Sequence, residues 1–367
     1  MCLNVPQMMP QKQVVIVGCG VVGAAIAYQL SRSSLAVQVI EARSQPAMGA
    51  TGAALGVLMA VCSQKPDGDL VRLRLASLSL YDRLISDLIA ETGIDIPYNR
   101  AGILSLYDAT DAEAKWLPTI LARQVQGFSL DWLDTKALRS QYPKLKASSG
   151  MYSECDRALN PAKLVQALVQ AATQNGADFA FDRPVERLAD LPKADWTVIT
   201  AGLGSNQLLD FGDRGDAPLL IPVGGQAIEV YLPGLDVPQV IHAVDAGGSD
   251  INMVPLGQDR YWIGATVEFD PTLLPRNSNI AALLEKAVQF CPMMREAKVL
   301  ETWAGYRPRP RQSRSPILGF VPGYQNLLVA TGHYRNGILM APISAQIVAD
   351  LIAQGDSNLP WKGFSLK

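Results

Sequence analysis

Hydrophobic and polar positions along the chain follow two different periods, and together they predict a mixed α/β fold. Residues 14–17 form a short run of β-branched apolar side chains, which is typical of a buried parallel strand. Residues 69–91 place apolar side chains on one broad helical face. The segment 161–177 predicts a second helix, which starts with Pro161 and stops at Gly176. We expect both helices to pack in the core.

The pattern changes between residues 222 and 269. There the stretches QAIEVYL, INMVPLG and RYWIGATVEF alternate with period two, which predicts an antiparallel sheet separate from the first strands. The other predicted elements are strands over 101–108 and NLLVATG, a strand pair around Phe179 and Val185, and helices over 111–126, 279–290 and near 343–352. The chain shows no internal repeat and no low-complexity tract.

Composition and charge narrow the class of protein. A chain of 367 residues is long enough for two domains with a sizeable core. The net charge of −2 gives no broad electrostatic reason to bind nucleic acid or an anionic membrane. The five cysteines form no CxxC pair, which indicates reduced thiols in a cytoplasmic protein. We find no signal-peptide pattern and expect no membrane-spanning run.

The glycines that follow the first strand point to a dinucleotide. Gly18, Gly20 and Gly23 form G-x-G-x-x-G between a strand and an Ala-rich helix, and Glu41 ends the next strand. The first glycine permits the tight turn, the second lets backbone approach a pyrophosphate, and the third lets the helix pack against the strand. The helix N-terminus offers free N–H groups to the phosphates, and the acid about 20 residues on can accept from a ribose hydroxyl.

The residues after Glu41 favour FAD over NAD. The segment EARSQPAMGATGAALGVLMA is rich in small residues, and Gly49, Gly52 and Gly56 allow backbone to approach a flat or charged ligand closely. A nicotinamide domain usually passes directly into another strand–helix unit, and this chain does not.

These motifs, with ETWAGYRPRP and LLVATGHYRNGILMAP near the C-terminus, carry a family resemblance over nearly the whole chain. The sequence resembles the FAD-dependent D-amino-acid oxidase superfamily, and within it the bacterial glycine oxidase and sarcosine oxidase branch. The resemblance implies an α/β fold, with a Rossmann-like FAD-binding domain of the glutathione-reductase type and a second α+β substrate domain built on an antiparallel sheet. The implied FAD-binding domain comprises residues 1–85, 150–220 and 305–367, and the substrate domain comprises 86–149 and 221–304.

The glycine motif and the resemblance together assign the cofactor contacts. They are Gly18, Gly20, Val21, Val22, Gly23, Glu41, Ala42, Ala50, Thr51, Leu55, Gly56, Val57, Val185, His333, Tyr334, Arg335, Asn336, Gly337, Ile338 and Leu339. The covalent-flavin cysteine of the monomeric sarcosine oxidases has no counterpart in RPRPRQSRSPILG, so we expect non-covalent FAD. No metal cluster and no Ser-His-Asp set can be assembled from the sequence. We expect His242 to be a buried, hydrogen-bonded histidine and His333 to belong to the flavin loop.

Arg307 matches the family arginine that binds the substrate carboxylate. A guanidinium suits this role because its fork pairs with a carboxylate bidentately and keeps its proton. Outside the motif GYRPRP, the ordinary interpretation of such a residue would be a surface charge or a salt bridge. Arg335 is expected to act through its backbone. GYRPRP and the residues after it are expected to form a loop. Its other arginines, Arg309, Arg311 and Arg314, are expected to be mostly solvated.

The substrate side departs from the family pattern. Asn252 stands where glycine oxidases have an aromatic hydroxyl that helps hold the carboxylate, Asp250 where they have a histidine, and Val267 where they have a methionine. Asn252 can still donate a hydrogen bond, with a different reach. These changes leave the FAD prediction intact and put glycine itself in doubt as the substrate.

The implied activity is oxidative deamination of a small amino acid or secondary amine acid of the glycine, sarcosine or D-amino-acid class. Hydride passes from the substrate α-carbon to flavin N5, and O2 reoxidises the flavin to give H2O2.

One alternative is a dehydrogenase that passes electrons to a quinone or protein acceptor. Another is a non-catalytic flavoprotein scaffold, against which Arg307 argues, and an NAD-dependent dehydrogenase ranks last. Family members often form homo-oligomers, but the sequence has no decisive interface signature.

Overall fold

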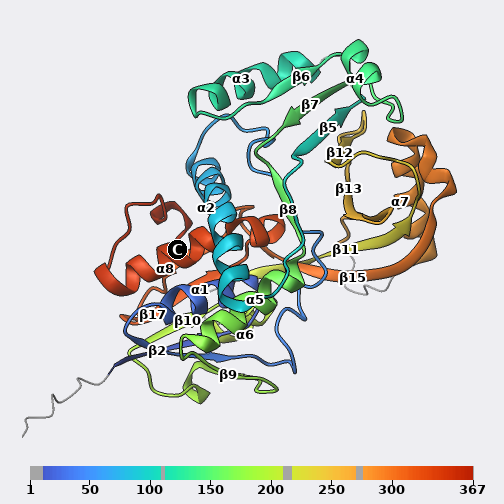
Figure 1. Cartoon of the computed structure of the whole chain (residues 1–367). Helices are drawn as coiled ribbons and strands as arrows, with labels where there is room; N and C mark the ends of the chain where they lie inside the picture. Colours follow the sequence, from blue (N-terminus) through green and yellow to red (C-terminus); the bar gives the residue numbers. More distant parts are fainter. Residues whose placement is uncertain (1–10, 109–111, 210–216, 270–275, 367) are drawn as a thin grey trace, which may run out of the picture.

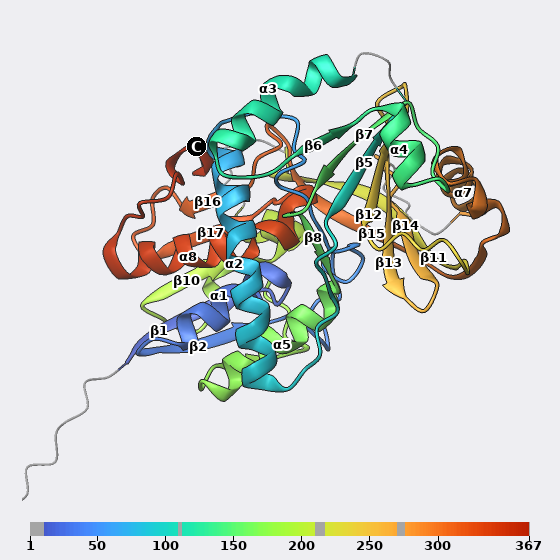
Figure 2. The same ribbon diagram turned by 45° about the horizontal axis from the view of Figure 1, so that its top comes forward.

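The computed structural model describes residues 11–108, 112–209, 217–269 and 276–366. Figures 1 and 2 show two sheets side by side, with a group of helices packed on the one that contains the N-terminal strand. Strands β11 (Leu220–Tyr231) and β15 (Lys298–Pro310) are the longest and extend from the second sheet towards the first. The mixed α/β architecture confirms the predicted fold class.

The first sheet has the order β16-β17-β10-β1-β2-β9. Its strands pair in parallel, except that β16 is antiparallel to β17. The bounds are β1 Lys12–Val17, β2 Leu35–Ile40, β9 Asp178–Ala180, β10 Trp196–Ile199, β16 Ile317–Phe320 and β17 Leu327–Thr331. Val14 and Ile16 pack under the helices, while Val15 and Val17 belong to a core cluster on the other face. The predicted buried parallel strand is therefore confirmed.

Four helices pack on this core: α1 (Val21–Ser31), α2 (Asp69–Thr92), α5 (Pro161–Gln174) and α8 (Gly337–Gln354). The prediction placed the last helix near 343–352, but α8 begins at Gly337 and contains Pro342. A proline N lacks the hydrogen that would bond to the carbonyl of Ile338, four residues earlier. The hydroxyl of Tyr81 in α2 donates to that carbonyl instead. This contact from another part of the chain lets the helix continue through the proline.

The second sheet has the order β15-β11-β14-β13-β12-β5-β7-β6. Its other bounds are β5 Ile103–Tyr107, β6 Asp131–Leu133, β7 Ser149–Ser153, β12 Val240–Val244, β13 Asp250–Gly257 and β14 Arg260–Gly264. Helices α4 (Thr135–Gln141) and α7 (Asn277–Phe290) cover one face through a shared apolar cluster. The predicted antiparallel strands are confirmed, although β12 escaped prediction and pairs in parallel with β5.

The smaller elements complete the chain. A three-stranded sheet joins β3 (Val57–Leu58), β8 (Arg157–Leu159) and β4 (Tyr98–Asn99). The remaining elements of the described residues are two helices and five short 3-10 turns. They are α3 (Ala112–Val125), α6 (Ser205–Leu208), η1 (Leu188–Asp190), η2 (Gly202–Gly204), η3 (Pro292–Glu296), η4 (Tyr334–Asn336) and η5 (Lys362–Phe364). Residue 111 of the predicted helix 111–126 lies outside the described residues.

Two local predictions were wrong. GYRPRP was expected to be a loop, but it lies in β15, where Arg307 pairs with Val223 of β11. Val185 was expected to lie in a strand, but only β9 forms there. After β9 the chain turns at Asp182 (φ +53°), and Arg183 N donates to the carbonyl of Glu41 at 3.0 Å. The turn leaves Val185 outside the sheet.

One helical segment, Tyr334–Gln354, is long and apolar enough to cross a membrane by length and composition. Most of it is buried inside the fold, against α1 and α2, as expected for a core helix. The predicted division into two discontinuous domains stays a prediction.

Candidate active site

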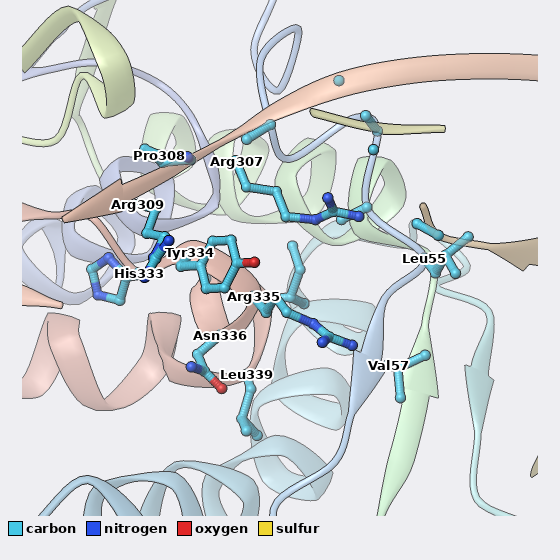
Figure 3. A pocket seen from close by; sticks show the side chains of 18 of the residues that line it. Leu55, Val57, Arg307, Pro308, Arg309, His333, Tyr334, Arg335, Asn336 and Leu339 are labelled. Atoms are coloured by element: carbon cyan, nitrogen blue, oxygen red, sulfur yellow. The ribbon is translucent and has the colours of Figure 1, made fainter. Parts of the chain in front are cut away.

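A large cavity of about 1390 Å³ is lined by residues from both large sheets. The predicted contacts that line it are Gly18, Gly20, Val21, Val22, Glu41, Ala50, Thr51, Leu55, Gly56, Val57, Asn252, Arg307 and the run from His333 to Leu339. Gly23, Ala42 and Val185 do not line it. Residues predicted from opposite ends of the chain thus meet around one space, part of which Figure 3 shows.

Two glycines of the motif after β1, Gly18 and Gly23, have no room for a Cβ atom. Gly18 has φ +104°, and a Cβ there would lie 2.8 Å from the carbonyl oxygen of Thr200. A Cβ at Gly23 would overlap the carbonyl oxygen of Gly18 and lie 2.6 Å from Thr200 Oγ1. Gly23 therefore supports the close packing of α1 on the turn without lining the cavity. Gly20, the N-cap of α1, lines it, so the helix N-terminus is presented to a ligand.

Glu41 lies beside this turn at the end of β2. One carboxylate oxygen accepts from Cys19 N at 2.6 Å and the other from Arg43 N at 3.0 Å. These bonds fix the carboxylate at the cavity wall and leave lone pairs for further donors, such as ribose hydroxyls. Burial, and then the charge of Glu41, raises the pKa of Cys19 to about 12, so that thiol stays protonated. The glycine turn, helix end and fixed acid together fit a dinucleotide such as FAD.

Arg307 also lines the cavity, and its side chain extends from β15 into the pocket (Figure 3). Its Nη1 donates to the carbonyls of Gly224 at 2.8 Å and Thr266 at 3.2 Å. A Cβ on Gly225 would lie 2.5 Å from Arg307 Cζ, so the glycine makes room for the guanidinium. Burial, and then the positive charge of Arg335, lowers the pKa of Arg307. An anion bound beside the guanidinium would stabilise its positive charge and so offset both effects.

Two other arginines behave differently from expectation. The side chain of Arg335, which was expected to matter through its backbone, lines the cavity and forms an ion pair with Asp250. Arg309 was expected to be solvated, but it is half-buried, with its guanidinium 5.9 Å from the ring centres of Phe269 and Tyr334. Arg311 and Arg314 are exposed, as predicted.

The two histidines are buried and hydrogen-bonded. His242 Nδ1 lies 3.0 Å from Asn252 Oδ1, and His333 Nε2 lies 2.9 Å from Ser344 Oγ. Burial lowers the pKa of His242, and it lowers that of His333 to about 4. Both rings are therefore neutral at pH 7, and the prediction of a buried, satisfied His242 is confirmed.

Sequence reasoning missed one wall of the cavity. Arg74 of α2 lines it, together with Tyr107, Trp116 and the segment 62–65. Arg123 fixes this segment from α3: the buried guanidinium donates to the carbonyls of residues 61, 63, 65 and 66. The only sequence signal for Arg74 was a charge within the apolar helical pattern of residues 69–91.

Comparison with known proteins identifies the family. The model of the FAD-dependent oxidoreductase family matches residues 13–351. The glycine oxidase of Geobacillus kaustophilus is 30% identical over 373 residues, covering 96% of each chain. The bifunctional protein ThiO/ThiG of Nostoc sp. is 31% identical over 95% of this chain, which spans 53% of that protein.

Solved structures agree with these matches. The crystal structure of glycine oxidase from Geobacillus kaustophilus superposes with a TM-score of 0.88 and 28% identity, covering 97% of this chain and 99% of that one. Glycine oxidase from Bacillus cereus gives 0.85 and 26%, with the same coverage of the two chains. The resemblance, the fold and the FAD cofactor predicted from the sequence are thereby confirmed. The chain belongs to the FAD-dependent oxidoreductase family, as a member of the glycine oxidase type.

Proposed function

We propose that the protein oxidises the CH–NH group of a small amino acid or secondary amine acid, with O2 as the electron acceptor and H2O2 as a product. Arg307 is the observation that carries the proposal. A half-buried guanidinium, held by two backbone carbonyls on the wall of a cofactor cavity, is suited to bind a carboxylate. A scaffold without catalysis has no use for such a group.

The carboxylate on Arg307 would orient the substrate in the cavity. Bound FAD supplies the redox chemistry, accepting hydride from the substrate α-carbon at N5. The segment from His333 to Asn336 leads into α8, whose N-terminus would stabilise negative charge at the pyrimidine end of the ring. Water then hydrolyses the imine product to a keto or aldehyde acid and ammonia or an amine.

We propose that no side chain of the protein acts as an acid or base on the substrate amine. His242 and His333 are neutral and already hydrogen-bonded, and neither is free to act as a cationic acid. An amine that arrives neutral needs no side-chain base before hydride leaves its α-carbon. Asn252, whose Oδ1 accepts a hydrogen bond from His242 Nδ1, is the proposed further contact to the substrate.

The proposal includes a cytoplasmic location. Cys19, Cys62, Cys155 and Cys291 are all free thiols in the described part of the chain, which suits a reducing compartment.

An anaerobic titration of the FAD-loaded protein tests the function. Glycine, sarcosine, D-alanine, D-proline and L-amino acids are added singly while the flavin absorption is recorded. We expect at least one to bleach the flavin band, and admitting air should restore it with H2O2 formed in equal amount. A band that none of these or other carboxylate-bearing amines bleaches contradicts the proposal. Bleaching without reoxidation in air would point to a quinone or protein acceptor.

A further inference from the structure

Helix α2 contributes a further positive charge to the lining of the cavity. Arg74 lies on α2 and lines the cavity, and its guanidinium donates to the carbonyl of Met59. Its Nε is buried and has no hydrogen-bond partner among the described residues. Burial lowers the pKa of Arg74 to about 10, which still leaves it charged at pH 7. A buried charged donor without a partner is costly unless a ligand completes it.

No carboxylate in the described chain pairs directly with Arg74. Asp156 is the acid whose negative charge acts on the pKa of Arg74. Its two carboxylate oxygens accept hydrogen bonds from the backbone N–H groups of Ala60, Val61 and Cys62 at 2.7–2.9 Å. Asp156 therefore serves the turn after β3, and the charge of Arg74 remains available to the cavity.

Arg335 connects this charge to the carboxylate site. Burial is the main cause that lowers the pKa of Arg307 and of Arg74, and the positive charge of Arg335 adds to the lowering of both. Figure 3 shows the side chains of Arg307 and Arg335 extending in the same direction into the pocket. Asp250 forms an ion pair with Arg335, whereas Arg74 has no acid partner among the described residues. In the described part of the chain, eight arginines and lysines line the cavity against three acids: Glu41, Asp245 and Asp250. A substrate carboxylate on Arg307 would leave Arg74 without an anionic partner.

We propose that Arg74 and Arg335 form a second anion site, and that the substrate carries a second carboxylate bound there. This inference rests on the proposed function, because the first carboxylate is the one assigned to Arg307. The aromatic wall of Tyr107 and Trp116 offers apolar surface to the carbon chain between the two carboxylates. The substrate class is an acidic amino acid, or a glycine whose nitrogen bears a carboxyalkyl chain.

Two unreactive acids measure the site without turnover. Glutarate and butyrate are titrated into the FAD-loaded protein, and binding is followed by calorimetry and by the flavin difference spectrum. We expect glutarate to bind at least tenfold more tightly than butyrate. Arg74→Met should abolish most of that preference and leave butyrate within twofold, while Arg74→Lys retains part of it. Arg72→Met is the matched control, since Arg72 is exposed on the same helix and pairs with Asp67.

Asp250→Asn should shift affinity in the opposite direction. The substitution releases Arg335 from its ion pair, so glutarate should bind severalfold more tightly. A gain of affinity cannot come from general damage to the fold, which separates the charge effect from misfolding.

Reactive substrates then identify the source of the second carboxylate. D-Aspartate and D-glutamate test the side-chain arrangement, and N-(2-carboxyethyl)glycine tests the N-linked one, each compared with glycine in kcat/KM. Equal affinity for glutarate and butyrate, equal weakening of both by Arg74→Met, or loss of FAD from that variant overturns the second site. If the glutarate preference holds but no amine bleaches the flavin, the proposed oxidation fails instead.

Discussion

The carboxylate of Asp250 pairs with the guanidinium of Arg335, and one of its oxygens lies 3.4 Å from Arg335 Nη1. The pair joins the start of β13 to the turn η4 that leads into α8. Burial raises the pKa of Asp250, but the charge and hydrogen bond of Arg335 outweigh it, and the net pKa lies below 3.8. At the cavity, the ion pair thus connects the second sheet to the segment between β17 and α8.

Asp250→Asn should destabilise the protein by about 1–2 kcal/mol, because it removes the acid partner of Arg335. The cost is below that of a fully buried pair because the Arg335 side chain is 43% exposed. A group whose pKa is lowered by folding stabilises above its unfolded pKa, and this contribution is lost as the pH falls through the folded value. Urea unfolding at pH 7 measures the change. Asp236→Asn, which breaks the exposed pair with Lys144, should cost under about 0.5 kcal/mol. Equal losses in the two variants would contradict the assignment.

Arg307→Met should abolish most turnover while FAD stays bound. Removing one partner of a buried charge pair costs roughly 2–5 kcal/mol, so kcat/KM should fall by about 1.5 to 3.5 orders of magnitude. Stopped-flow flavin reduction measures the rate, and the absorption spectrum measures FAD content. Arg311→Met, at an exposed position just beyond β15, should match the wild type. An Arg307 variant that loses FAD would assign this arginine to the cofactor.

The strand–glycine–helix unit was predictable because each of its steps is local. Gly18, Gly20 and Glu41 lie within one stretch whose turn chemistry has few alternatives. The side-chain roles of Arg335 and Arg74 could not be predicted, because they depend on partners remote in sequence. Arg335 pairs with Asp250, and Arg74 donates to the carbonyl of Met59. The same reason applies to α8, whose passage through its proline depends on Tyr81. Local pattern carries no information about such contacts.

Glu41→Gln should weaken FAD binding at least tenfold. The amide keeps the shape and one acceptor, but it loses the charge that strengthens hydrogen bonds from hydroxyl donors, worth about 1.5–3 kcal/mol. FAD dissociation constants, from quenching of flavin fluorescence, test the effect. Glu91→Gln is the control, since Glu91 bonds to Tyr28 and does not line the cavity. Unchanged FAD affinity in Glu41→Gln would reject the ribose role.

Gly23→Ala should impair both folding and FAD binding. The added Cβ would overlap the carbonyl oxygen of Gly18, which is backbone and cannot move aside without shifting α1. Overpacking of this kind costs about 1–3 kcal/mol or more. Thermal unfolding and FAD content are measured against Gly363→Ala, where the nearest atom to a new Cβ lies at 3.8 Å. A Gly23→Ala protein with wild-type melting and full FAD would show that the helix can retreat without loss.

His333 should make the protein less stable below neutral pH. Burial lowers the pKa of His333 to about 4 in the folded protein, against 6.5 when unfolded, so the unfolded state binds the extra proton first. Stability therefore falls as the pH drops from about 6.5 to 4, by about 3 kcal/mol in total for this group. Burial also lowers the pKa of His242, which adds a loss of the same sign.

His333→Gln isolates this contribution, because the glutamine amide can still bond to Ser344 but does not titrate. Urea unfolding of both proteins is measured from pH 7 to pH 4.5, with FAD in fixed excess. The wild type should lose more stability over that range, and the variant should keep the smaller slope that His242 contributes. The difference arises because only a neutral ring occupies the apolar site beside α8, and protonation must be coupled to unfolding. Parallel curves for the two proteins would mean that His333 is protonated in place, with water or a moving side chain admitted to its site.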